Sequence, residues 1–401
     1  MPATQTHEIT AAQRLDNLRY AIRDLVATAD EVKRQGHKVL YLNVGDPNIF
    51  DFAPPAHIVE AAYRAMRDNK NGYAPSAGVP QALDAIRAQA EKNGFTSIQN
   101  VFITNGAGEA VDLSLTALLN PGENVLTPRP DYPLYPAVLC KIGAEANPYY
   151  LNEGDGWQPE LSDIKKRINS RTRAIVLINP NNPTGALCTR KMLEDLAELA
   201  RQHNLLIIAD EIYDKLILDG GEHISLAAVA PDVPVVTIGG LSKNYLVPGW
   251  RMGWGIVSGE AAAVKPYIEG IHKMLRARLS ANHPQQYAIK PALEGPQDHL
   301  IEVRRKLTAR RDLTVQTCNS IPGMSCVPPR GAFYAFPRID VPEEDSTWVK
   351  ELLLQKHILT VQGSGFGQKP GSKHFRIVFL PQEETLLQAY SEIGDFMRER
   401  G

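Results

Sequence analysis

The sequence has few cysteines, almost no net charge and no long apolar run. The four cysteines, Cys140, Cys188, Cys318 and Cys326, lie far apart, which excludes a zinc-finger spacing and a disulfide framework. A net charge of −2 gives no reason to expect a nucleic acid or an anionic membrane as partner. No apolar run approaches the ~20 residues of a membrane span, and the N-terminal stretch "MPATQTHEITAAQRLDNLRY" lacks the apolar core of a secretory signal. We therefore expect a cytoplasmic protein with reduced thiols and no bound metal.

Short apolar runs alternate with helical patterns from about position 100 onward. The runs "NVFIT", "RAIVLI", "LLIIA" and "VVTI" consist mainly of apolar residues without alternation, as strands do when both faces of their sheet are buried. Helical segments such as "TRKMLEDLAELARQHN" separate them. The pattern predicts an α/β fold with a mainly parallel sheet between helices.

A second, smaller α+β unit is expected from the rest of the chain. It would contain the charged helices near positions 300–316 and the strands "GAFYAF" and "FRIVFL". A chain of 401 residues is long enough for two domains. We predict a large domain over residues 46–289 and a discontinuous small domain over residues 1–45 and 290–401.

Polar clusters follow the apolar strands of the predicted large domain. They are Asn105-Gly106, the segment 179–185 ("NPNNPTG"), the segment 210–213 ("DEIY") and Lys243. In open α/β sheets, ligands bind at the carboxyl ends of the strands. The sequence therefore predicts one ligand site at this edge.

Two of these residues suggest a specific chemistry. Burial lowers the pKa of a lysine, so Lys243 could act as an amine nucleophile that forms a Schiff base. The alternative is a solvated lysine that opens a helix. A carboxylate directly after an apolar strand, such as Asp210, needs a charged or donor partner, and the pyridinium nitrogen of pyridoxal phosphate is one. The alternative for Asp210 is the N-cap of a following helix.

Three further residues could contact the ring of such a cofactor. Tyr213 could reach the phenolate oxygen of the ring, and Asn182 could donate a hydrogen bond to the same oxygen. Tyr132 could stack on the ring face. Each residue also has a purely structural interpretation. Tyr213 could be a core residue, Asn182 could belong to a rigid proline turn, and Tyr132 could be a loop aromatic.

Anion sites are predicted at two places. The turn "TNGAGEA" leads into a helix whose first N–H groups can bind phosphate, with Ser242 and Arg251 adding a hydroxyl and a cation. Arg376 lies within the apolar strand "KHFRIVFL", where an unpaired guanidinium would be very costly. Its partner is either a structural carboxylate or the carboxylate of a substrate.

Taken together, these motifs resemble the class I aminotransferases, which are fold-type-I pyridoxal-phosphate enzymes. The segments "VGDPN", "NGYAPSAG", "NPNNPTG", "DEIY" and "LSK", and the arginine eight residues after the lysine, occur in the order of that family. The segments "PDYPLY", "ARQHNLLIIADEIYDK" and "CVPPRGAFYAFP" are most similar to the bacterial alanine (glutamate–pyruvate) aminotransferases. The resemblance implies a large domain whose mainly parallel sheet lies between helices, and a smaller α+β domain.

The resemblance also implies roles for individual residues. Lys243 would form the Schiff base and move the proton at the α-carbon of the substrate, and Asp210 would hold the pyridinium nitrogen. Tyr213, Asn182 and Tyr132 would contact the ring. The phosphate would be surrounded by Ala107, Gly108, Glu109, Ser242 and Arg251, and by Tyr73 of the neighbouring subunit in a homodimer. The substrate α-carboxylate would meet Arg376, Asn182 and the backbone of Gly45. Gly240 departs from the family pattern, which often has a serine there.

The expected reaction is transamination between alanine and 2-oxoglutarate, giving pyruvate and glutamate. Tyr20 and Arg23, one helical turn apart, could form the side-chain pocket, with Arg23 facing the γ-carboxylate of glutamate. Alternatively, Arg23 is a solvated helix charge.

Three other functions stay open. One is a class I aminotransferase with an aspartate, aromatic or branched-chain donor, and another is a C–S lyase or cyclopropane-carboxylate synthase on the same scaffold. The third, a non-catalytic regulator, would need a DNA-binding domain ahead of "VGDPN", where only about forty residues stand.

Overall fold

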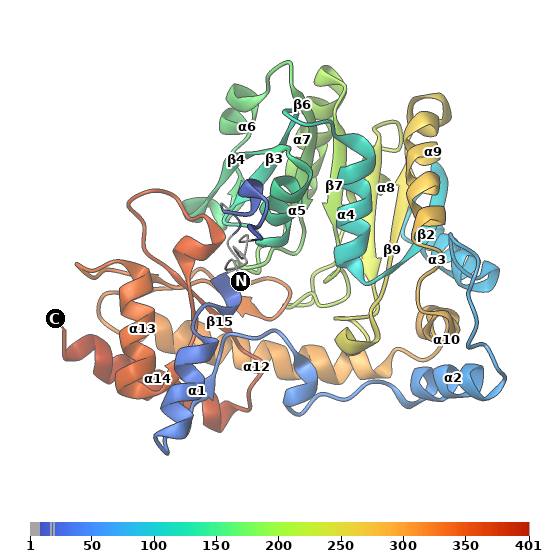
Figure 1. Ribbon diagram of the computed structural model, residues 1–401. Helices are drawn as coiled ribbons and strands as arrows, with labels where there is room; N and C mark the ends of the chain where they lie inside the picture. The colour runs from blue at the N-terminus through green and yellow to red at the C-terminus, as the bar shows by residue number, and fades with distance from the viewer. Residues whose placement is uncertain (1–8, 17, 19–20, 401) are drawn as a thin grey trace, which may run out of the picture.

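The computed structural model describes residues 9–16, 18 and 21–400, and of Arg23 only the backbone (Figure 1). Its largest element is an eight-stranded sheet in the order β2-β9-β8-β7-β6-β3-β4-β5. The strands are β2 (Ile98–Asn105), β3 (Asn124–Arg129), β4 (Glu145–Asn152), β5 (Gln158–Pro159), β6 (Thr172–Ile178), β7 (Leu206–Asp210), β8 (Val235–Gly240) and β9 (Met252–Ser258). Strand β9 runs antiparallel to β2 and β8, and β5 runs antiparallel to β4, whereas β4, β3, β6, β7 and β8 are mutually parallel. The predicted mainly parallel sheet is confirmed.

Helices cover both faces of this sheet, which is why its central strands β6, β7 and β8 are mainly apolar. Along β6, Ala174, Val176 and Ile178 belong to one core cluster, and Ile175 and Leu177 belong to another. The first cluster packs against α4 (Ala107–Leu118), α5 (Leu134–Ile142) and α9 (Ala261–Ala277). The second packs against α3 (Pro80–Lys92), α6 (Leu161–Arg167), α7 (Arg190–His203) and α8 (Leu226–Val229). In Figure 1, α4 and α5 lie in front of the strands.

The two ends of the chain share a second core. Strand β1 (Leu40–Tyr41) pairs in parallel with β13 (Ile358–Leu359). Leu40 and Leu42 join a cluster with Trp348, Phe375 and Phe396. This pairing agrees with a discontinuous small domain, although its exact boundaries stay a prediction.

The remaining elements of this part are short strands and long helices. The strands are β10 (Met324–Ser325), β11 (Tyr334–Ala335), β12 (Arg338–Ile339), β14 (Val361–Gln362) and β15 (Phe375–Val378), and the helices are α1 (Val26–Arg34), α12 (Asp298–Ser320), α13 (Asp345–Lys356) and α14 (Glu383–Arg398). The expected strand "GAFYAF" is shorter than predicted, because Ala332 has a left-handed φ of 58° that interrupts the extended backbone before β11.

Smaller helices connect these parts. They are α2 (Ala56–Arg67), α10 (His283–Gln286) and α11 (Ile289–Glu294), with the 3₁₀ helices η1 (Gln13–Leu15), η2 (Ala21–Arg23), η3 (Pro47–Ile49), η4 (Glu153–Asp155), η5 (Pro248–Trp250) and η6 (Gly363–Phe366). Within the described residues, no helix combines the length and the apolar character that crossing a membrane requires.

Burial of the sheet core predicts a large effect for one truncation. Ile208 on β7 is fully buried, whereas Ile301 on α12 is 65% exposed. Ile208→Ala should lower the free energy of unfolding in urea by about 2–5 kcal/mol, and the matched Ile301→Ala should change it by less than about 0.5 kcal/mol. Equal losses for the two variants would contradict the burial assigned to β7.

Candidate functional site

The polar clusters that follow β2, β6, β7 and β8 meet at one cavity. Among its lining residues are the predicted site residues Ala107, Gly108, Tyr132, Asn182, Asp210, Tyr213, Ser242, Lys243 and Arg251. They come from segments that are far apart in sequence and share only their position at the carboxyl edge of the sheet. These side chains therefore lie at the carboxyl ends of the strands, where ligands bind in open α/β sheets.

One end of the cavity is suited to an anion. Helix α4 begins at Ala107, and the first N–H groups of a helix have no partner within it. The guanidinium of Arg251 lies against the turn before this helix, where a Cβ on Gly106 would come within 2.5 Å of Nη2. Gly106 has a φ of 85°, so glycine is needed for both the backbone conformation and the close approach. Ser242 adds a hydroxyl to the same cavity.

Glu109, which was predicted to lie near the phosphate, makes different contacts. Its Oε2 accepts a hydrogen bond of 2.7 Å from the backbone N–H of Asn105 and lies 3.4 Å from Nη1 of Arg278. Its own N–H donates to the carbonyl of Gly106. These contacts hold the first turn of α4, and Glu109 is not among the residues that line the cavity.

Asp210 is a buried carboxylate at the end of β7. Its Oδ2 accepts a hydrogen bond of 3.0 Å from the hydroxyl of Tyr135, and its Oδ1 accepts one of 3.3 Å from the N–H of Ile212. Burial raises the pKa of its carboxyl to about 6, although these two hydrogen bonds act in the opposite direction. The chain then forms a turn over residues 212–215 and not a helix, so Asp210 is not a helix N-cap.

Lys243 lies in the turn after β8. Its Nζ donates a hydrogen bond of 2.9 Å to the carbonyl of Gly45. Burial lowers the pKa of its ammonium group to about 8. Asp46 opposes this shift, whereas the positive charges of Arg376 and Arg251 add to it. The amine is therefore neutral in a substantial fraction of molecules slightly above neutral pH.

Arg376 lies beside the cavity on β15 and is 1% exposed. Nη1 donates to Oδ1 of Asn182 over 3.0 Å, and Nη2 donates to the carbonyl of Asn43 over 2.5 Å. The rings of Tyr334 and Phe366 lie 4.7 and 4.8 Å from its Cζ. Because a guanidinium only donates, Oδ1 of Asn182 faces Arg376, and its Nδ2 remains a donor elsewhere in the cavity.

Two tyrosines that contact predicted site residues were missed by sequence reasoning. Tyr135 supports Asp210, and the hydroxyl of Tyr334 lies 2.8 Å from that of Tyr213. Both occur in quoted motifs, "PDYPLYP" and "GAFYAF". A usable signal for Tyr135 was its position three residues after Tyr132, but nothing local in the sequence marked Tyr334.

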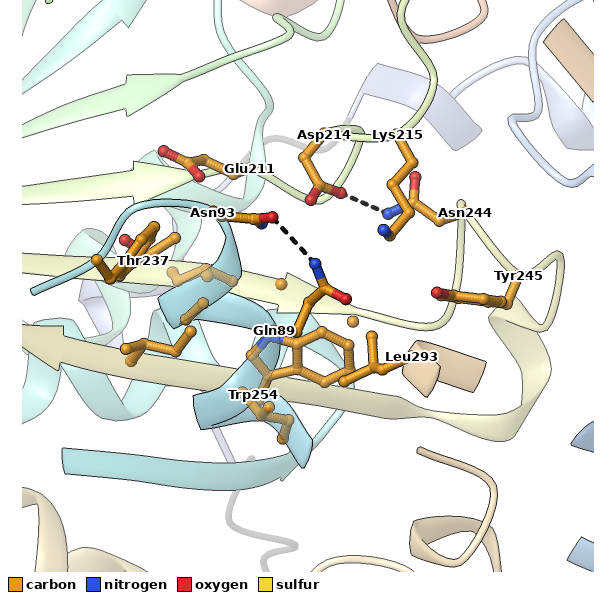
Figure 2. A pocket seen from close by; sticks show the side chains of 17 residues that line it. Gln89, Asn93, Glu211, Asp214, Lys215, Thr237, Asn244, Tyr245, Trp254 and Leu293 are labelled. Atoms are coloured by element: carbon orange, nitrogen blue, oxygen red, sulfur yellow. Dashed lines mark hydrogen bonds between the residues drawn. The ribbon is translucent and has the colours of Figure 1, made fainter. Parts of the chain in front are cut away.

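A hydrogen bond behind the cavity joins two of the turns that carry site residues. Figure 2 shows Nδ2 of Asn244 donating to Oδ1 of Asp214, at a distance of 2.6 Å. Asp214 follows Tyr213 and Asn244 follows Lys243, so this bond fixes the two turns relative to each other. Both residues line a separate small pocket between α3 and the sheet.

Tyr73 and Gly45 are not among the residues that line the cavity. The side chain of Tyr73 is 81% exposed. Gly45 contacts a site residue through its carbonyl, which accepts the hydrogen bond from Lys243. Tyr20 and the side chain of Arg23 lie outside the described residues, so the proposed side-chain pocket stays a prediction. A Cβ on Gly240 would lie 2.7 Å from the carbonyl oxygen of Met252, so this backbone leaves no room for the serine common in the family.

Comparison with known proteins shows to which family the chain is similar. Residues 37–393 match the family described as aminotransferase class I and II. The glutamate-pyruvate aminotransferase AlaA of Escherichia coli K12 is 40% identical over 97% of this chain and 98% of that protein. An alanine aminotransferase of Mycobacterium bovis is 40% identical over 96% of this chain and 91% of that protein.

Solved structures extend the likeness to the fold. An alanine aminotransferase from Pyrococcus furiosus has a TM-score of 0.95 and 42% identity, covering 98% of this chain and all of the other. A mutant aspartate aminotransferase of Thermus thermophilus has a TM-score of 0.88 and 28% identity, covering 97% of this chain and all of the other. The predicted fold is thereby confirmed, and the chain belongs to the class I and II aminotransferases.

Proposed function

We propose that the protein is a pyridoxal-phosphate-dependent aminotransferase that exchanges an amino group between alanine and 2-oxoglutarate. The observation that carries the proposal is the cavity itself. The cavity is lined by Lys243, whose pKa is lowered, by the buried carboxylate of Asp210, and by the start of α4 beside Arg251. Pyridoxal phosphate offers an aldehyde, a ring nitrogen and a phosphate, one for each of these groups.

The residues of the cavity fit the cofactor group by group. The phosphate would be held by the free N–H groups at the start of α4, by Ser242 and by Arg251. Asp210 would accept the ring N–H, which supplies the cationic partner that a buried carboxylate needs. Nδ2 of Asn182 and the hydroxyl of Tyr213 would donate to the ring oxygen, and Tyr132 would stack on the ring.

Three residues of the chain would then carry the reaction. When bound, pyridoxal phosphate supplies a ring that withdraws electrons from the α-carbon of the substrate. Arg376 would hold the α-carboxylate bidentately, assisted by Asn182. The neutral amine of Lys243 would take the proton from the α-carbon and deliver it to the cofactor, because its lowered pKa suits a general base near neutral pH.

The choice of alanine rests on the relatives. The glutamate-pyruvate and alanine aminotransferases at 40% identity favour this pair of substrates over an aspartate, aromatic or branched-chain donor. A C–S lyase would use the same cavity, since both reactions need the same ring contacts. The fate of the nitrogen distinguishes the two.

A homodimer with shared sites is part of the proposal. Val59, Tyr63 and Met66 form an apolar stripe on α2 and are 41%, 52% and 43% exposed. Tyr73 follows this helix and is exposed as well. A second copy that covers this face would place Tyr73 near the phosphate of the neighbouring cavity.

The four cysteines form no disulfide, which supports a cytoplasmic location.

A matrix of amino donors against 2-oxo acids tests the function. Alanine with 2-oxoglutarate should give the highest kcat/KM, at least about tenfold above aspartate, aromatic or branched-chain donors. The nitrogen should appear in a second amino acid. Release of ammonia in place of glutamate would identify a lyase, and a preferred donor other than alanine would refute the substrate assignment.

The lowered pKa of Lys243 predicts how the apoprotein takes up the cofactor. Only the neutral amine attacks an aldehyde, so the rate of reconstitution should rise with pH and level off above a pKa of about 8. Stopped-flow absorption measures this rate. A rate that still climbs about tenfold per pH unit beyond about pH 9 would show that the lysine has its ordinary pKa.

Mixing two impaired variants tests whether the sites are shared. In a mixed dimer of Tyr73→Ala and Lys243→Ala, the site that retains Lys243 receives an intact Tyr73 from its partner. Random exchange at equal amounts should give about a quarter of wild-type activity under limiting cofactor, because half of the dimers carry one complete site. Activity no higher than the mean of the two parents, in confirmed mixed dimers, would place Tyr73 outside the neighbouring site.

A further inference from the structure

Tyr334 touches three parts of the proposed active site. It lies on β11, is 3% exposed and lines the cavity. Its ring lies 4.7 Å from Cζ of Arg376, and its hydroxyl lies 2.8 Å from that of Tyr213. A Cβ on Gly45 would collide with this hydroxyl, so the glycine leaves the space that Tyr334 occupies. The carbonyl of the same glycine accepts the bond from Lys243.

The protons of the two hydroxyls fix the direction of their hydrogen bond. Each tyrosine carries one hydroxyl proton. Burial holds the pKa of Tyr213 well above its usual range, so its hydroxyl stays protonated. If Tyr213 donates that proton to the ring oxygen of the cofactor, the bond between the tyrosines must run from Tyr334 to Tyr213.

We propose that Tyr334 is a positioning residue that donates a hydrogen bond to Tyr213 and thereby strengthens the bond from Tyr213 to the ring oxygen. Successive hydrogen bonds polarise one another, by roughly 10–30% per bond. The ring of Tyr334 stacks on the guanidinium of Arg376. Tyr334 therefore contacts both Arg376, the proposed binding residue for the substrate carboxylate, and Tyr213, a proposed contact of the cofactor ring. This inference rests on the proposed binding of pyridoxal phosphate.

The visible absorption of the holoenzyme, titrated with pH, tests the role. A hydrogen bond to the ring oxygen stabilises negative charge there and favours the deprotonated chromophore. Tyr334→Phe removes only the hydroxyl and keeps the ring over Arg376. It should move the titration midpoint to higher pH by about 0.3–0.5 unit, a two- to threefold change in the dissociation constant. Tyr213→Phe should move it further in the same direction.

Two further variants separate this role from a structural one. In the Tyr213→Phe background, the added Tyr334→Phe substitution should cause no further shift, because its effect passes through the hydroxyl of Tyr213. Tyr245→Phe is the matched control. That hydroxyl is also buried and lies two residues from Lys243, but it donates to Oε1 of Gln297 over 3.1 Å, away from the cavity. Its loss should leave the midpoint unchanged.

Each outcome decides a different claim. A normal cofactor band whose midpoint is the same in wild type and Tyr334→Phe would overturn the role of Tyr334 alone. An equal shift with and without the hydroxyl of Tyr213 would also overturn it, because the effect would then bypass Tyr213. A wild-type protein that forms no visible band with pyridoxal phosphate would overturn the proposed function, and this inference with it.

Discussion

The site depends on a carboxylate that the fold buries at the end of a central strand. Asp210 ends β7, with strands on both sides and helices on both faces of the sheet. Burial raises the pKa of this carboxyl, and although the hydrogen bonds from Tyr135 and Ile212 act in the opposite direction, the pKa is still about 6. A cationic N–H in the cavity would complete its environment. Under the proposed function, Asp210 would therefore orient the ring of the cofactor.

Two uncharged residues, Asn182 and Gly45, lie between the proposed position of the cofactor ring and the proposed position of the substrate carboxylate. Oδ1 of Asn182 accepts a hydrogen bond from Arg376, which leaves the N–H₂ group of Asn182 available to the cavity. Gly45 accepts from Lys243 and makes room for Tyr334. Groups without charge can link the cations Lys243 and Arg376 without cancelling either one. That is a physical reason why both cations can remain available for an amino acid, which brings a carboxylate and an amine together.

The sequence predicted those parts of the site that follow from strand ends. Asp210 ends an apolar strand, Lys243 and Asn182 lie in the turns that follow two others, and the geometry of α/β sheets brings such positions together. Tyr135 and Tyr334 were missed because their hydroxyls bond partners 75 and 121 positions away, so a local pattern shows only aromatic core. The antiparallel direction of β9 was also not foreseen, since an apolar run does not reveal its direction. Glu109 was assigned to the phosphate by resemblance, and its contacts with Asn105 and Arg278 became visible only in three dimensions.

The most direct test of this account is to find where the cofactor is attached. Borohydride reduction of the holoenzyme fixes pyridoxal phosphate to its lysine, and peptide mapping by mass spectrometry identifies the modified residue. We expect a single pyridoxyl label on Lys243, in the peptide that contains "GGLSKNYLVPGW". A label on any other lysine, or no label after reduction, would contradict it.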